Sequence, residues 1–105
     1  DLESLGLKRP FVESNYKSAC AQYTLRHPKR DQLQKKLKEK GVPTAVYYPL
    51  TMFAHEPYKK TARAHNISHA EQACKEVLSI PIYPDLPENL QSQIIETFIE
   101  CCQSV

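Results

Sequence analysis

Residues 41–50, Gly-Val-Pro-Thr-Ala-Val-Tyr-Tyr-Pro-Leu, constrain the fold more than any other stretch of the chain. Glycine adopts positive φ at little cost, so Gly41 is expected to end the basic helix that precedes it. A short strand is then predicted from about Thr44 to Tyr48. Pro49 ends this strand because proline has no N–H to donate to a β-ladder. One helix end and one strand are therefore fixed within ten residues.

Two further strands are predicted elsewhere in the chain. Residues 19–26 alternate between the two faces of an extended segment, which is typical of a half-buried strand. Residues 78–83 form a mostly apolar run that contains Pro81. Because Pro81 cannot donate to a ladder, this strand is expected at a sheet edge.

Helices are predicted between and after these strands. Pro28 disfavours helix just before it, so the first helix begins near Lys29, with Leu33 and Leu37 four residues apart on its buried face. A second helix is expected to begin with a capping box at residues 68–71, Ser-His-Ala-Glu. The last helix carries an apolar stripe at helical spacing: Leu90, Ile94, Ile95, Phe98, Cys101 and Cys102.

The predicted order is strand, helix, strand, helix, strand, helix. Three short strands are too few for a doubly wound sheet of normal size. The sequence therefore predicts an α+β fold, with a small, mainly antiparallel three-stranded sheet and helices packed on one face as a two-layer sandwich.

The composition is that of one globular domain. The chain has 105 residues, of which 41% are hydrophobic and 25% are charged, and chains need disulfides or metals mainly below about 40 residues. A net charge of +2 gives no case for nucleic acid. No apolar run approaches the roughly 20 residues that would span a bilayer. The first residues lack a signal-peptide pattern, so no membrane association is expected.

The four cysteines favour a reducing compartment. Cys20 and Cys74 lie in apolar-periodic segments and are predicted to be small core residues. Cys101 and Cys102 are adjacent and cannot easily pair with each other in a helix. No C-x-x-C motif occurs. We therefore expect a cytoplasmic protein.

Tyr47 and Tyr48 are the main candidates for binding. They come at the end of a predicted strand, just before a loop closed by Pro49, where they could form the wall of a site. Alternation along a strand would put the two side chains on opposite faces. The alternative is that both tyrosines simply suit β structure.

Other candidates carry less weight. His65 and His69 have the spacing of two zinc ligands on one helix, but His65 precedes the predicted helix and no third ligand is evident. His27 is expected to face solvent. The sequence shows neither a nucleophile elbow nor a glycine-rich phosphate loop, so no catalytic, cofactor or metal residue is assigned.

The basic helix could touch phosphates. It has no interleaved aromatic residues, which nucleic-acid sites usually add, so a solvated helix face is favoured. Its basic residues are Lys29, Arg30, Lys35, Lys36, Lys38 and Lys40.

Three stretches together carry a family resemblance. Residues 21–26 read Ala-Gln-Tyr-Thr-Leu-Arg, residues 41–49 Gly-Val-Pro-Thr-Ala-Val-Tyr-Tyr-Pro, and residues 76–84 Glu-Val-Leu-Ser-Ile-Pro-Ile-Tyr-Pro. They resemble the sugar aminotransferases of the DegT/DnrJ/EryC1/StrS family (fold type I), which use pyridoxal phosphate (PLP). Two positions depart from the family pattern: Tyr47 stands where His is usual, and Cys20 where Trp is often found.

The resemblance implies a place in a larger enzyme. Residues 19–105 would be its small C-terminal domain, and residues 1–18 a lead-in from an interdomain helix or linker. The family's His-Tyr pair lies close to the active site, so Tyr47, Tyr48 and Pro49 are implied to contact the substrate. Tyrosine is a poorer proton carrier than histidine near neutral pH, so no catalytic role is transferred to Tyr47.

The family's cofactor-binding large domain has no counterpart in this sequence, and no lysine here matches its Schiff-base lysine. The implied function is therefore part of a nucleotide-sugar aminotransferase of polysaccharide biosynthesis, a fragment or truncated product that is inactive alone. PLP is expected in the full-length enzyme. The implied partner is the large PLP-binding domain, in cis or in trans, within a dimer or other homo-oligomer. The alternative is a free-standing binding or self-assembly module derived from this domain.

Overall fold

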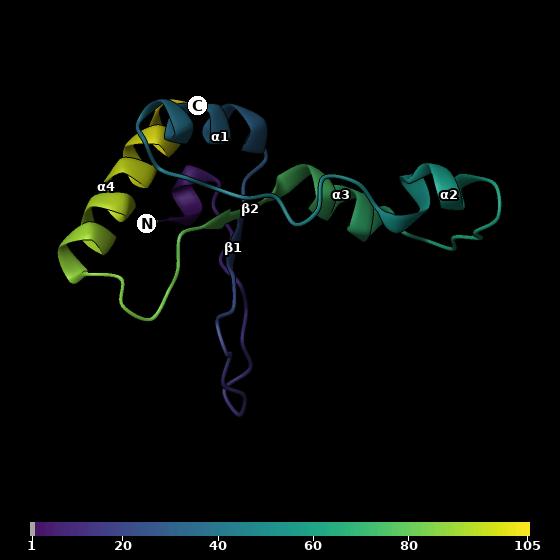
Figure 1. Cartoon of the computed structure of the whole chain (residues 1–105), viewed down its shortest axis with the longest axis horizontal. Coiled ribbons are helices and arrows are strands. Elements are labelled where there is room, and N and C mark those ends of the chain that lie inside the picture. The colour runs from purple at the N-terminus through teal and green to yellow at the C-terminus, as the bar shows by residue number, and fades with distance from the viewer. Residues whose placement is uncertain (1) are drawn as a thin grey trace.

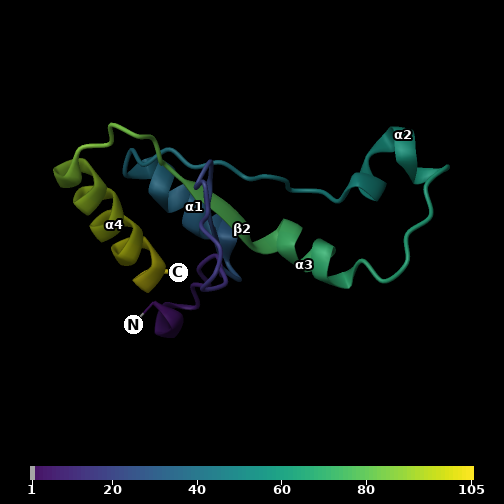
Figure 2. The same ribbon diagram turned by 90° about the horizontal axis from the view of Figure 1, so that it is seen from below.

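The computed structural model describes residues 2–105. The chain forms a body with two projections (Figures 1 and 2). One projection is an exposed loop, residues 9–22, which we call the hairpin loop. The other, residues 46–76, we call the arm; it carries η2 (Met52–Ala54), α2 (Glu56–Lys59) and α3 (Ser68–Glu76).

The body contains a two-stranded antiparallel sheet rather than the three strands expected. β1 (Tyr23–Arg26) pairs with β2 (Val77–Ile80). The predicted strand at 44–48 contributes only an isolated bridge between Ala45 and Ser79. The chain then bends at Tyr47 and leaves the sheet, so the ladder cannot continue. The fold class is α+β, as predicted, with fewer strands.

Both paired strands are also shorter than predicted. Cys20 has a positive φ of 50°, outside the extended region, so β1 begins only at Tyr23. Cys20 is exposed, and its assignment to the core was wrong. β2 ends at Ile80 because Pro81 follows and has no N–H.

Helix α1 (Arg30–Glu39) ends as the sequence predicted. Gly41 has φ +79°, its N–H donates to the Lys38 carbonyl, and the Val42 N–H donates to the Leu37 carbonyl at 2.8 Å. This pair of bonds is the Schellman motif. Val42 and Leu37 are both buried, which supplies the apolar contact that accompanies this helix end.

We expect Gly41→Ala to destabilise the chain by about 1 kcal/mol. An added Cβ would meet no atom within 4 Å, so the loss comes from the positive φ and not from a clash. Gly41→Asn should cost less, because asparagine tolerates this conformation better than alanine. Urea unfolding of both variants measures the difference, and equal losses would contradict the explanation.

The core lies where α1 and α4 (Glu88–Gln103) meet the sheet. Leu33 and Leu37 are fully buried, as predicted. On α4, Leu90 and Ile95 are exposed, so the predicted stripe was too wide. The buried apolar residues are Leu7, Leu25, Leu33, Leu37, Val42, Leu78, Ile94, Phe98, Cys101 and Cys102.

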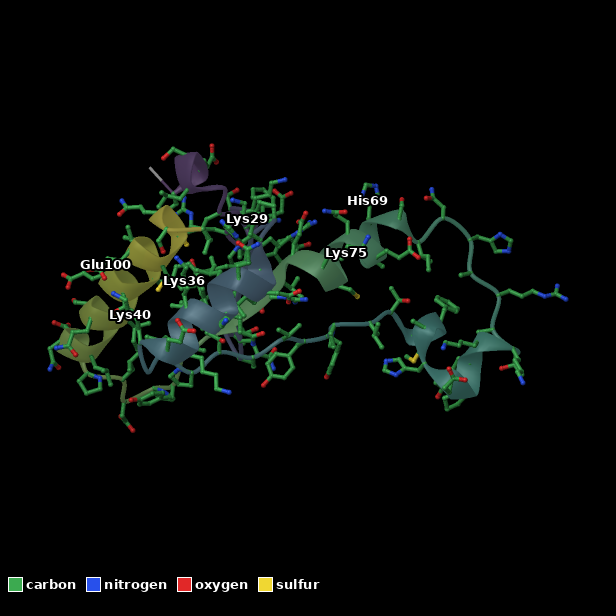
Figure 3. All side chains as sticks on the ribbon, turned by 90° about the horizontal axis from the view of Figure 1, so that it is seen from above. Lys29, Lys36, Lys40, His69, Lys75 and Glu100 are labelled. Carbon is green, nitrogen blue, oxygen red and sulfur yellow. The ribbon has the colours of Figure 1, made fainter. Side chains whose placement is uncertain are left out.

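Lysines of the basic helix hold the last turns of α4 (Figure 3). Lys36 Nζ donates to the Ser104 carbonyl at 2.6 Å, and Lys40 Nζ lies 2.8 Å from Glu100 Oε2. Lys29, just before α1, reaches the Val105 carbonyl. Cations at a helix C-terminus are favourable because they face the negative end of its dipole. The basic face of α1, which was expected to be solvated, therefore partly contacts the end of α4.

Two residues expected at the surface are buried. His27 is 5% exposed; its Nδ1 accepts the Lys29 N–H, so its Nε2–H can donate to the Leu5 carbonyl at 3.1 Å. Arg30 is 6% exposed and donates to the carbonyls of Cys74 and Val77. Arg30 therefore joins the start of α1 to the junction of α3 and β2.

The predicted capping box at the start of α3 is wrong. The N-cap residue is Ile67, and it makes no side-chain cap. Ser68 is the first helical residue, and its hydroxyl bonds to Asn66 Oδ1. The helix begins one residue too early for the Ser68 hydroxyl to accept the Glu71 N–H, which donates to the Ile67 carbonyl instead.

Candidate functional site

Tyr47 and Tyr48 lie together on the surface where the arm leaves the body. Their exposed fractions are 48% and 69%. The ring centroids are 5.7 Å apart and the ring planes meet at 74°, an edge-to-face contact. The expectation of opposite faces was wrong, because the bend at Tyr47 interrupts the alternation of the strand. Pro49, also exposed, follows directly.

The segment just before the tyrosine pair is anchored to the body. Ala45 N–H donates to the Ser79 carbonyl at 3.0 Å, and Ser79 N–H donates to the Ala45 carbonyl at 2.7 Å. Gln34, on α1, donates its side-chain amide to Thr44 Oγ1 at 3.4 Å. Val46 packs against the core. The tyrosine pair therefore extends from a fixed edge of the body.

The tyrosine pair has groups that can bind a ligand. Each phenol can donate and accept a hydrogen bond, and each ring offers an apolar face. This combination suits a ligand with hydroxyl groups on an apolar ring. Tyr47, Tyr48 and Pro49 follow one another along the chain, and all three are exposed.

The histidine pair does not form a metal centre. His69 is exposed on α3 (Figure 3), and the sequence assignment places His65 in the coil before this helix. Within residues 2–105, no three or more His, Cys, Asp and Glu side chains are arranged to hold a metal ion.

Sequence reasoning missed an apolar groove on the body. It has a volume of about 320 Å³ and lies between the sheet, α4 and the first residues of the chain. Its lining includes Leu25, Ile80, Leu86, Ile95 and Phe98. The alternation of β1 and the apolar stripe of α4 were the signals for it. These patterns predict core residues, because a sequence does not show which apolar side chains lack a covering element.

A charged cluster joins β1 to the end of α3. Arg26 contacts Glu76 Oε2 through Nε at 2.9 Å and Nη2 at 2.7 Å, and Gln72 donates to Glu76 Oε1. The Gln72 hydrogen bond, with the Arg26 contacts, holds the pKa of Glu76 below its ordinary value of 4.5. A depressed carboxyl pKa contributes stability above that ordinary value, and the contribution is lost as the pH falls through the folded-state pKa.

We therefore expect stability to fall as the pH drops below about 4.5, the ordinary pKa of a glutamate. Glu76→Gln should flatten this part of the profile, because glutamine does not titrate. Urea unfolding at several pH values between about 3 and 6, which span the ordinary pKa of glutamate, measures how steeply the free energy of unfolding changes with pH. An unchanged slope in Glu76→Gln would contradict the assignment to Glu76.

Comparison with known proteins identifies the family. The profile of the DegT/DnrJ/EryC1/StrS aminotransferase family matches residues 1–99. The chain belongs to this family. The family is PLP-dependent.

The family relatives are much longer than this chain. A pleiotropic regulatory protein of Geobacillus stearothermophilus is 45% identical over 84 residues, 75% of this chain and 22% of its own length. A UDP-2-acetamido-2-deoxy-3-oxo-D-glucuronate aminotransferase of Pseudomonas aeruginosa is 38% identical over 85 residues, 81% of this chain and 23% of its own length. The chain thus spans about a quarter of the relatives that it matches.

Part of a solved structure has the same fold. The S. venezuelae DesV structure, in complex with a ketimine intermediate, superposes with a TM-score of 0.88 at 26% identity. The match covers 95% of this chain and 27% of DesV.

The apolar groove does not fit PLP. A PLP site requires a lysine nucleophile close to groups that hold the pyridine ring and the phosphate. The groove has no lysine in its lining, and Lys36 and Lys40 are bound to α4. No PLP chemistry is therefore assigned to residues of this chain.

The helices between residues 2 and 105 include none with the length and apolar character of a membrane span.

Proposed function

We propose that this chain is the small C-terminal domain of a PLP-dependent nucleotide-sugar aminotransferase, and that Tyr47, Tyr48 and Pro49 contact the sugar substrate. The observation that carries the proposal is the exposed tyrosine pair on an anchored edge, in a chain that belongs to an aminotransferase family. The substrate class comes from the P. aeruginosa relative, which is a UDP-2-acetamido-2-deoxy-3-oxo-D-glucuronate aminotransferase.

The remainder of the enzyme supplies the cofactor in this proposal. The large domain holds PLP, in cis or in trans, and the small domain adds contacts to the substrate within a homo-oligomer. The activity belongs to polysaccharide biosynthesis in the cytoplasm, and the four free cysteine thiols are compatible with a reducing compartment.

The test uses a protein that joins this chain to its large domain. We expect Tyr48→Ala to raise KM for a UDP-linked 3-keto sugar about tenfold, the effect of losing roughly one hydrogen bond of 1.4 kcal/mol. Tyr58→Ala is the matched control, because Tyr58 is an exposed tyrosine farther along the arm. Equal kinetics for the two variants would overturn the assignment of the tyrosine pair.

The purified 105-residue chain should not transaminate that sugar when PLP is added. Activity in this preparation would contradict the division of labour between the two domains. The control is the joined protein, assayed at the same molar concentration.

A second candidate, a self-assembly module, is favoured by the open apolar groove. Ile82 and Ile95 line it and are 39% and 47% exposed. Exposed apolar patches often mark interfaces. Light scattering tests this candidate. A monomer at every protein concentration across a range of about a hundredfold would weigh against it.

A further inference from the structure

We propose that Thr24 and Ser79 are positioning residues for the Tyr47–Tyr48 pair. The inference rests on the proposed function in one respect: contact with the substrate is the reason why the position of these rings matters. The Thr24–Ser79 contact fixes the point from which the tyrosine pair extends.

Ser79 connects three segments of the chain. Its main-chain N–H and C=O both bond to Ala45, at 2.7 and 3.0 Å. On its other side, Ser79 is in register with Thr24 of β1. Because both main-chain groups of Ser79 face Ala45, the Thr24–Ser79 pair is of the type without main-chain bonds, in which side chains lie close together. Thr24 Oγ1 and Ser79 Oγ are 2.8 Å apart.

The side-chain bond matters because Ser79 is buried. Ser79 is 4% exposed, and Thr24 is the side chain that satisfies its hydroxyl. A buried hydroxyl without a partner is costly, so loss of the Thr24 hydroxyl would push Ser79 to move or to admit water. Either change acts directly on Ala45, whose bridge is formed by the main chain of Ser79.

The bridge between Ala45 and Ser79 is the nearest main-chain anchor of the tyrosine pair. Within the described residues, the main chain of residues 46–50 makes no hydrogen bond. Ala45 is therefore the last hydrogen-bonded point before Tyr47, two residues further on. A shift of Ala45 passes along the chain to the two rings.

The location of these residues in the sequence supports a shared role. Thr24, Ala45 and Ser79 come from the three stretches at 21–26, 41–49 and 76–84 that carry the family resemblance. The fold brings the three stretches into contact at this one place. Their convergence sets the position of the tyrosine pair.

The test compares Thr24→Val with Thr24→Ser in the whole 105-residue chain, labelled for NMR. Valine keeps the shape of threonine and removes the hydroxyl, whereas serine keeps the hydroxyl. We expect Thr24→Val to speed hydrogen exchange of the Ala45 amide about tenfold, the effect of one lost hydrogen bond, and to weaken the NOE between the rings of Tyr47 and Tyr48. Thr24→Ser should leave both signals unchanged.

The Val42 amide is the internal reference, because it bonds to the Leu37 carbonyl at the end of α1 and not to Ser79. Equal acceleration at Val42 and Ala45 would show a general loss of stability and overturn the inference. An unchanged Ala45 amide in Thr24→Val would also overturn it. Ser79→Ala added to Thr24→Val removes the orphaned hydroxyl, and should recover part of the Ala45 protection.

The two proposals fail separately in these experiments. If Thr24→Val moves the rings but Tyr48→Ala leaves KM of the joined protein unchanged, the positioning holds and the proposed contact between the tyrosine pair and the substrate fails. If Tyr48→Ala raises KM but Thr24→Val leaves the rings in place, the reverse is true.

Discussion

Leu33→Ala is expected to lower the free energy of unfolding by about 3 kcal/mol, within the range for large-to-small changes in a core. Leu33 is fully buried on α1 and belongs to the cluster shared by α1, α4 and the sheet. Truncation removes apolar contacts and leaves a cavity that the surrounding helices fill only in part. Urea unfolding, followed by circular dichroism, measures the loss.

Leu50→Ala is the control for this prediction. Leu50 lies on the arm and is 50% exposed, so its truncation should change stability by no more than about 0.5 kcal/mol. A loss below about 1 kcal/mol for Leu33→Ala would mean that the site collapses around alanine, and would contradict the packing described for α1.

Arg30→Met is expected to cost about 3 kcal/mol, because it removes the donors of a buried cation while leaving its acceptors in place. Arg30 Nη1 and Nη2 donate to the Val77 and Cys74 carbonyls at 2.9 and 3.2 Å. Methionine fills much of the same volume and donates nothing. The ion pair with Asp31 adds little, since Asp31 is 84% exposed and salt bridges at the surface are weak.

Lys35→Met is the matched control, since Lys35 is exposed on the same helix and makes no ion pair within residues 2–105. The two variants are compared by urea unfolding. Equal stability losses in Arg30→Met and Lys35→Met would show that the Arg30 contacts contribute nothing measurable. Asp31→Ala should resemble the control, because its partner retains both carbonyl acceptors.

Helices were predicted from the sequence better than strands, for a physical reason. The end of α1 depends on local chemistry, and Gly41 supplies it within one turn. Strand length depends on partners that are distant in sequence. Ala45 finds Ser79, but the bend at Tyr47 removes the next residues from the ladder. The positive φ of Cys20, which no periodicity reveals, shortens β1 in the same way.

Charged and polar side chains were the least predictable part of the core. Arg30 sits among lysines in the sequence, and the pattern gives no sign that its partners are carbonyls at the end of α3. His27 was likewise expected at the surface, but it joins the first residues of the chain to α1. Contacts of this kind require knowledge of which main-chain groups the fold leaves unpaired.

The assignment of a binding site to the tyrosine pair stays a prediction, and the geometry of the pair was not predictable from the sequence. The resemblance selected Tyr47, Tyr48 and Pro49, and the structure places all three on the surface. Their edge-to-face contact was not apparent from the sequence. The bridge that anchors them joins positions 45 and 79, a pairing that strand alternation alone cannot specify.

The hairpin loop should tolerate the insertion of extra residues. Its ends are closed by paired bonds between Lys8 and Arg26, both at 2.9 Å, while residues 9–22 lie exposed beyond them. Closure entropy grows slowly with length, so doubling this loop should cost only about 0.6 kcal/mol. A peptide epitope or a spectroscopic label could therefore be inserted near Ser14, leaving the tyrosine pair and the core undisturbed.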